Sequence, residues 1–133
     1  MAEFVLPRES FPTDEDKVGL AMALARENDL RGTGLPFGAA VFQRGSGRLV
    51  GVGVNLAASH NNSLLHAETV ALMAAQAALG TSSLNGSGEG KGHELAASSQ
   101  PCAIEPHPVP WTQVCHHAAS LVKYDSLNSA GLI

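Results

Sequence analysis

The sequence has no apolar run of the ~18 residues that a membrane-spanning helix needs. The N-terminus, which begins Met1-Ala2-Glu3-Phe4, lacks the basic start and the apolar core of a secretory signal. A cytoplasmic location without a membrane partner is therefore the default expectation. Charged residues make up only 15% of the chain and apolar residues 44%, a balance that favours a folded domain over a disordered segment.

Basic residues and cysteines are also few. Eight lysines and arginines stand against twelve acidic residues, and the formal net charge is -4. Because no basic stripe indicates a nucleic-acid surface, we expect no extended DNA or RNA partner. The two cysteines, Cys102 and Cys115, are better suited in a cytosolic chain to metal binding or reactivity than to a disulfide.

The first half of the sequence predicts a helix followed by a hairpin. Residues 1–12 contain two prolines and are expected to form an N-terminal arm, with a single domain at 13–133. Thr13 is a suitable N-cap, and apolar residues at helical spacing predict a helix at 14–30. Short strands are predicted at 39–42 and 49–55, with a glycine-rich turn between them.

The second half begins with a further helix, predicted at about 65–79. A flexible loop at 81–92 and a third strand at 93–98 follow it. This order of elements favours a layered α/β domain with a mixed sheet. Three prolines argue against a helix at 105–110, and residues 110–133 form a divergent tail in which no element is assigned after 112.

The residues that can carry chemistry stand at the starts of two predicted helices. His66 and Glu68 are two positions apart, so they can serve one site only beyond a helix N-terminus, where first-turn side chains converge. Cys102 follows Pro101, a residue favoured in first helical turns, and a helix N-terminus favours the thiolate that binds metals. Two helix N-termini meeting at one cation would be geometrically coherent.

These motifs resemble those of the cytidine and deoxycytidylate deaminase superfamily, in the branch of nucleobase, guanine and tRNA adenosine deaminases. His66-Ala67-Glu68 matches the catalytic motif, and residues 101–104 match the start of the Pro-Cys-x-x-Cys zinc motif. Residues 35–41, Leu-Pro-Phe-Gly-Ala-Ala-Val, resemble the segment before the family's first strand. Val109-Pro110-Trp111 matches a segment after the zinc motif, and the resemblance covers residues 14–114.

The resemblance implies a three-layer α/β/α fold around a mixed, five-stranded sheet, commonly in homodimers. It also implies zinc-dependent hydrolytic deamination of a free nucleobase or nucleoside, guanine-like or cytosine-like. His66 and Cys102 would bind zinc, Glu68 would move the proton, and Asn55 would contact the base. Phe37 could stack on the base, although its apolar neighbours favour a position in the core.

The zinc motif departs from the family where its second cysteine is expected, since this chain has Glu105 there. Glu105 could ligate through oxygen, or His107 or Cys115 could supply the third ligand. The favoured interpretation is a two-ligand site that binds zinc weakly or not at all, because zinc sites need three or four protein groups. After Cys115 the family resemblance ends, so the C-terminal part of the fold is expected to be altered or incomplete.

Two other functions stay open beside a small-molecule deaminase. One is a catalytically impaired remnant that acts only as a binding or partner subunit. The other is a tRNA adenosine deaminase, which the acidic composition disfavours.

Overall fold

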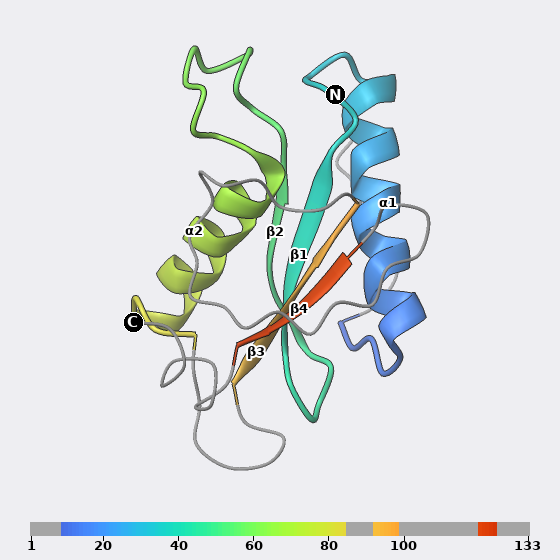
Figure 1. Cartoon of the computed structure of the whole chain (residues 1–133), viewed down its shortest axis with the longest axis vertical. Helices are drawn as coiled ribbons and strands as arrows, with labels where there is room; N and C mark the ends of the chain where they lie inside the picture. The colour runs from blue at the N-terminus through green and yellow to red at the C-terminus, as the bar shows by residue number, and fades with distance from the viewer. Residues whose placement is uncertain (1–8, 85–91, 99–119, 125–133) are drawn as a thin grey trace.

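The structure is a computed structural model that describes residues 9–84 and 92–98 and the backbone of 120–124. Within these residues the strands form one sheet in the order β2-β1-β3-β4, and every neighbouring pair is antiparallel. The two helices cover opposite faces of this sheet, which gives three layers (Figure 1). The elements are α1 Asp14–Leu30, β1 Gly38–Gln43, β2 Leu49–Val54, α2 Ala67–Leu79, β3 His93–Ala97 and β4 Ser120–Tyr124.

Helix α1 begins and ends where its sequence favours. Thr13 has extended backbone angles, and its side-chain oxygen accepts a hydrogen bond from the Asp16 amide at 3.1 Å. Three acidic residues in the first turn add favourable interactions with the helix dipole. The helix ends at Leu30, and Gly32 then adopts a φ of 66°, a left-handed conformation that glycine adopts without steric cost.

Helix α2 lies unusually close to β2 because both contact faces consist of small residues. Ala67, Ala71 and Ala75 follow one another at four-residue spacing and are all buried. They face Gly51 and Gly53 of β2, and a Cβ atom at Gly53 would overlap the Ala67 carbonyl oxygen and the Ala71 amide nitrogen. This close packing fixes the position of the α2 N-terminus over the sheet.

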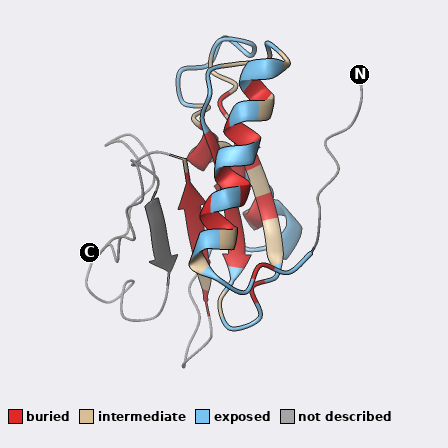
Figure 2. Cartoon of the chain, turned by 90° about the vertical axis from the view of Figure 1, so that its right-hand side faces the viewer, coloured by how far each residue is buried: buried red, intermediate tan, exposed pale blue. Residues whose placement is uncertain are grey.

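The apolar core is divided between the two faces of the sheet. Figure 2 shows the exposed outer face of α1 in front of the buried sheet. On the α1 face, Phe11 and Phe42 pack edge to face with ring centroids 5.3 Å apart. Phe11 belongs to the segment expected to form an N-terminal arm, yet its side chain is part of the core. The domain boundary at residue 13 stays a prediction.

Most of the predicted elements are confirmed. The helices expected at 14–30 and about 65–79 are α1 and α2, and the predicted hairpin and third strand are β1, β2 and β3 with slightly shifted ends. The three-layer α/β class is also confirmed. All pairs among the described strands are antiparallel, so the parallel pairing of a mixed sheet is not found within residues 9–84, 92–98 and 120–124. None of the described helices is long and apolar enough to cross a membrane.

Candidate functional site

The loop between β2 and α2 brings two predicted site residues to one end of the sheet. Its neck is closed by a hydrogen bond from the Leu56 amide to the Leu65 carbonyl oxygen at 3.0 Å. Within the loop, the side-chain oxygen of Asn62 accepts a hydrogen bond from the Leu64 amide at 3.0 Å. Asn55 and His66 immediately flank this closed neck, so a separation of eleven positions in sequence becomes a close approach in space.

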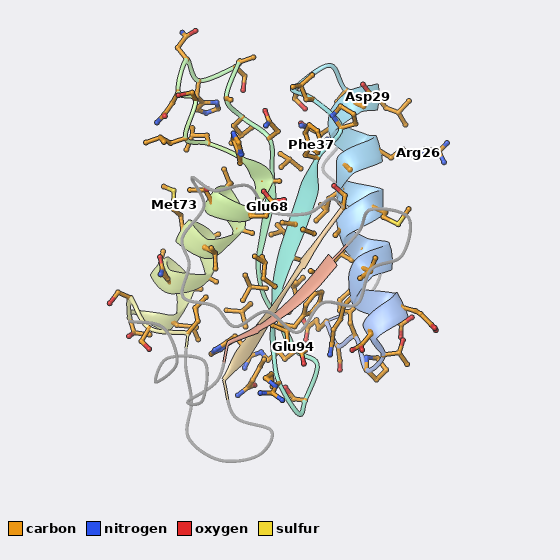
Figure 3. All side chains as sticks on the ribbon, viewed as in Figure 1. Arg26, Asp29, Phe37, Glu68, Met73 and Glu94 are labelled. Carbon is orange, nitrogen blue, oxygen red and sulfur yellow. The ribbon has the colours of Figure 1, made fainter. Side chains whose placement is uncertain are left out.

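His66 and Glu68 stand at the start of α2, as the sequence predicts. His66 is the N-cap residue, with extended backbone angles, and its side chain makes no capping hydrogen bond. Glu68 is the second residue of the helix and is only 3% exposed. The first turn of a helix is a favourable place for an acidic side chain because of the helix dipole. Figure 3 shows Glu68 at the N-terminal end of α2, beside the sheet.

Asn55 follows β2 directly and is 6% exposed. Its side-chain oxygen Oδ1 accepts a hydrogen bond from the Ala57 amide at 3.2 Å. None of the hydrogen bonds between described residues uses its side-chain nitrogen Nδ2. A buried amide donor without a protein acceptor is costly, and a ligand atom that accepts a hydrogen bond would satisfy it. The geometry therefore supports the predicted role of Asn55 in ligand contact.

Phe37 lies at the same end of the sheet, just before β1 (Figure 3). Its side chain is 37% exposed, so the expectation that it sits in the core is wrong. The local sequence is apolar, but the chain turns outward here and the buried residues begin only at Gly38. The Phe37 carbonyl oxygen accepts a hydrogen bond from the Asn55 amide at 3.1 Å, which places the backbone of Phe37 next to that of Asn55. Its exposure leaves the ring accessible for stacking on a planar ligand.

A metal site is incomplete among the described residues. Within residues 9–84 and 92–98, no group of three histidine, cysteine, aspartate or glutamate side chains can hold a metal ion. His66 is the one predicted zinc ligand in this part of the chain. The others, Cys102 and the candidates Glu105, His107 and Cys115, lie outside the described residues. The donor set that the structure places is thus one imidazole, which is too few ligands for zinc on its own.

The end of β3 is nevertheless fixed beside the site. The Ser98 amide donates to the Gly38 carbonyl oxygen at 2.9 Å, and the Gly38 amide donates to the Ser98 hydroxyl at 3.0 Å. Gly38 begins β1 and directly follows Phe37. The chain therefore leaves β3 at the end of the sheet where Glu68, Phe37 and Asn55 are placed.

One pocket of the described structure is lined by none of the predicted site residues. It has a volume of about 440 Å³ and lies between the C-terminal half of α1 and the outer edge of β2. Apolar side chains of Leu24, Val52 and Val54 line it, whereas His66, Glu68 and Asn55 do not. Among the described residues, the α2 N-terminus and the neck of the preceding loop combine an acid, an imidazole and a buried amide, which suits them to chemistry better than this apolar pocket.

Comparisons with known proteins identify the family to which the chain is similar. Residues 12–127 match a family model described as the cytidine and deoxycytidylate deaminase zinc-binding region. Among solved structures, the chain is similar to a guanine deaminase from Nitrosomonas europaea, with 37% identity and a TM-score of 0.65 over 71% of this chain and 51% of that one. A comparison with curated protein sequences finds no match.

Two further structures extend the likeness. A guanine deaminase from Bacillus subtilis shares 29% identity, with a TM-score of 0.61 over 69% of this chain and 54% of that one. A structure from work on tRNA:A34 deaminases shares 27% identity, with a TM-score of 0.57 over 66% of this chain and 61% of that one. The chain thus spans between 51% and 61% of the length of these three proteins.

Proposed function

Because the chain belongs to the cytidine and deoxycytidylate deaminase family, we propose that it catalyses the hydrolytic deamination of a free, guanine-like base. The observation that carries the proposal is the position of Glu68, buried in the first turn of α2 beside the N-cap His66. Asn55, with a buried amide donor, flanks the same loop neck. Two of the similar structures are guanine deaminases, which favours guanine-like over cytosine-like substrates.

Glu68 would act as the proton carrier of the reaction. A water molecule attacks the ring carbon that bears the amino group, and Glu68 takes a proton from this water and gives it to the adjacent ring nitrogen. Glu68 then moves a second proton from the new hydroxyl group to the amino group. The carbon–nitrogen bond breaks, ammonia leaves, and a carbonyl group remains on the ring. A carboxylate that is 3% exposed can hold each proton at the reacting atoms without losing it to bulk water.

The zinc ion expected for this family would be held by His66 and Cys102, with Glu105, His107 or Cys115 as the third ligand. When bound, zinc makes water a better nucleophile near neutral pH. Cys102 follows Ser98 by four residues, so the two Cα atoms can be at most about 14 Å apart. Since Ser98 is bonded to Gly38 at the site end of the sheet, this length of chain is compatible with a cysteine ligand there.

The base would be bound by Asn55 and Phe37. The Nδ2 group of Asn55 would donate a hydrogen bond to a ring nitrogen or carbonyl oxygen of the base. The exposed ring of Phe37 would stack on its face. Small ligands of this kind need no basic surface, which agrees with a net charge of -4. The homodimer and the cytoplasmic location expected from the sequence stay proposals.

The proposal is tested by measuring ammonia release from zinc-loaded protein with guanine, cytosine, adenine and their nucleosides. We expect turnover with guanine, and a loss of at least about 100-fold in kcat for Glu68→Gln, the magnitude typical of a lost general acid–base group. Met73→Gln changes an exposed residue of the same helix and serves as the matched control. Absence of ammonia with every base, or full turnover in Glu68→Gln, would refute the proposed reaction.

A catalytically impaired remnant is the second candidate function, and one observation favours it. Glu105 stands where the resemblance to the family predicts the second zinc cysteine. In this case the natural chain would hold little zinc and release no ammonia, whereas Glu105→Cys would bind zinc stoichiometrically. Zinc analysis of both proteins after dialysis separates the two candidates, since an active enzyme must already hold one zinc ion per chain without the substitution. A tRNA adenosine deaminase is the remaining alternative, and the same ammonia assay with a tRNA substrate tests it.

A further inference from the structure

Asn28 is a buried polar residue to which the sequence gives no role. It lies in the last turn of α1 and is 3% exposed. Its Nδ2 group donates two hydrogen bonds, to the carbonyl oxygens of Leu35 at 2.9 Å and Asn55 at 3.0 Å. Its Oδ1 atom accepts a hydrogen bond from the hydroxyl group of Thr33. The whole hydrogen-bonding capacity of the amide nitrogen is therefore used by backbone that surrounds the candidate site.

These hydrogen bonds belong to a closed ring that contains both residues proposed to bind the base. The Leu35 carbonyl oxygen also accepts from the Phe37 amide at 2.8 Å, and the Phe37 carbonyl oxygen accepts from the Asn55 amide at 3.1 Å. The Asn55 carbonyl oxygen returns to Asn28. The ring thus runs from Asn28 through Leu35, Phe37 and Asn55 and back to Asn28, and it joins the end of α1 to the start of β1 and the end of β2.

The residues packed around this hydrogen-bonded ring leave its backbone little room to move. A Cβ atom at Gly34 would overlap the Asn55 carbonyl oxygen and would come within 2.8 Å of Nδ2 of Asn28. Only glycine fits between these two groups. Asn55 itself is anchored on its other side by the hydrogen bond from the Ala57 amide to its Oδ1 atom. The direction of the remaining donor, Nδ2 of Asn55, is consequently set by its backbone position, and Asn28 holds that backbone.

We propose that Asn28 is a positioning residue for base binding, which rests on the proposed function. It fixes Asn55 and Phe37 relative to each other, so that the side-chain amide of Asn55 and the aromatic ring of Phe37 contact the same base. Asn28 itself contacts neither the base nor the proton. Glu68 lies on α2, which is held to β2 by the separate packing of Ala67 and Ala71 on Gly53. Loss of Asn28 should therefore weaken base binding and leave the proton-transfer step in place.

The hydrogen-bonded ring requires the primary amide of the Asn28 side chain. Aspartate has nearly the same shape but donates no hydrogen bond from its carboxylate. Asn28→Asp therefore removes the side-chain donor of the Asn55 carbonyl oxygen and leaves the Leu35 carbonyl oxygen with the Phe37 amide as its donor. Glu27→Gln is the matched control, because Glu27 precedes Asn28 on α1 and its partner is Arg31 and no residue of the ring. Thr33→Val removes the hydroxyl group that donates to Oδ1 and to the backbone carbonyl oxygen of Asn28. It keeps both hydrogen bonds from Nδ2 and is the milder variant if Asn28→Asp does not fold.

The experiment measures kcat and KM for guanine, together with the dissociation constant of 8-azaguanine by titration calorimetry, a base that a similar protein binds. For Asn28→Asp we expect KM and the dissociation constant to rise about tenfold, equivalent to 1.4 kcal/mol, with kcat nearly unchanged. Thr33→Val should raise both in the same direction by less, and Glu27→Gln should change neither. In the folded fraction of Asn28→Asp, an unchanged KM, or a fall in kcat without a change in KM, would overturn the positioning role.

Failure of the underlying function gives a different result. If the natural chain neither turns over guanine nor binds 8-azaguanine, the proposed function fails, and the base-positioning role falls with it. If the natural chain is active and Asn28→Asp matches it in KM and binding, only the positioning role fails. The NMR signals of the Asn55 side-chain amide add a readout without substrate. They should shift in Asn28→Asp and stay in place in Glu27→Gln, and identical signals in all three proteins would contradict the ring.

Discussion

Two buried glutamates, at opposite ends of the sheet, differ in what surrounds them (Figure 3). Glu94 on β3 is 5% exposed and lies between two cations: its Oε2 atom is 2.7 Å from Nζ of Lys17, and its Oε1 atom is 3.6 Å from Nε of Arg44. Glu68 has similar burial but stands in the first turn of a helix, next to an imidazole. Burial alone therefore does not separate a carboxylate in a charge network from the one proposed to transfer protons.

The difference lies in what each carboxylate connects. Lys17 belongs to α1 and Arg44 follows β1, so Glu94 joins a helix, the hairpin and β3 in one charge network. Removing one member of such a buried network leaves an uncompensated charge, which costs stability. Glu68 stands where β2, α2 and the chain leaving β3 converge. Its replacement by an amide of equal size should lower the rate of the proposed reaction strongly and the free energy of unfolding only slightly.

The largest expected effect is on stability, at the Glu94 end. Glu94→Gln should lower the free energy of unfolding by about 3–5 kcal/mol, because Lys17 stays buried without its counter-charge. Replacing both members, in Lys17→Met with Glu94→Leu, should cost less than the single change, since no charge is then left buried. Urea unfolding of the three proteins measures this. A double variant less stable than Glu94→Gln would show that the charge network is not the source of the loss.

An intermediate effect is expected at the contact that holds Glu68 in place. Gly53→Ala should destabilise the protein by about 1–3 kcal/mol, because the new methyl group overlaps the backbone of α2 at Ala67 and Ala71. It should also lower kcat, since α2 must move and carries Glu68 with it. Thermal unfolding and ammonia release measure the two effects. Full activity in the folded Gly53→Ala protein would mean that the position of α2 is not critical for the reaction.

Gly19→Ala is the control for that substitution. A Cβ atom at Gly19, in the middle of α1, meets nothing within 4 Å. Alanine there should raise the free energy of unfolding by about 0.5–1 kcal/mol, the helix preference of alanine over glycine, and leave activity unchanged.

The smallest loss is expected at the α1 N-terminus, on the Glu94 side of the molecule. Thr13→Ala removes the acceptor of the Asp16 amide and should cost about 1 kcal/mol of unfolding free energy. Because Thr13 is remote from Glu68, kcat and KM for guanine should not change in the folded protein. Thr13→Ser keeps the cap and should restore stability. A change in KM in Thr13→Ala would show that the two ends of the sheet are coupled.

The sequence predicts the elements whose signals are local. Thr13 and the helical spacing of apolar residues define α1, and the apolar pattern after His66 and Glu68 places both at the start of the helix predicted at about 65–79. β4 has no such signal, because a strand of five residues is specified by its pairing with β3 across more than twenty positions. The apolar neighbours of Phe37 predict a position in the core, because they do not reveal that the chain turns outward before β1.

The remaining features depend on contacts between distant residues. Lys17 and Glu94 are 77 positions apart, and Asn28 and Asn55 are 27 apart, so neither pair forms a periodic pattern. In the sequence, Asn28 resembles any polar residue in a last helical turn. Cys102 and the candidate third ligands lie outside the described residues, so the zinc site stays a prediction.

The assignment of proton transfer to Glu68 is tested most directly by comparing Glu68→Gln with Glu94→Gln in one experiment. Ammonia release from guanine and urea unfolding are measured on both variants and on the natural chain. We predict that Glu68→Gln loses at least about 100-fold in kcat and keeps its unfolding free energy within about 1 kcal/mol, whereas folded Glu94→Gln keeps kcat and loses stability. Retention of kcat in Glu68→Gln, or the same loss of kcat in both variants, would contradict the assignment.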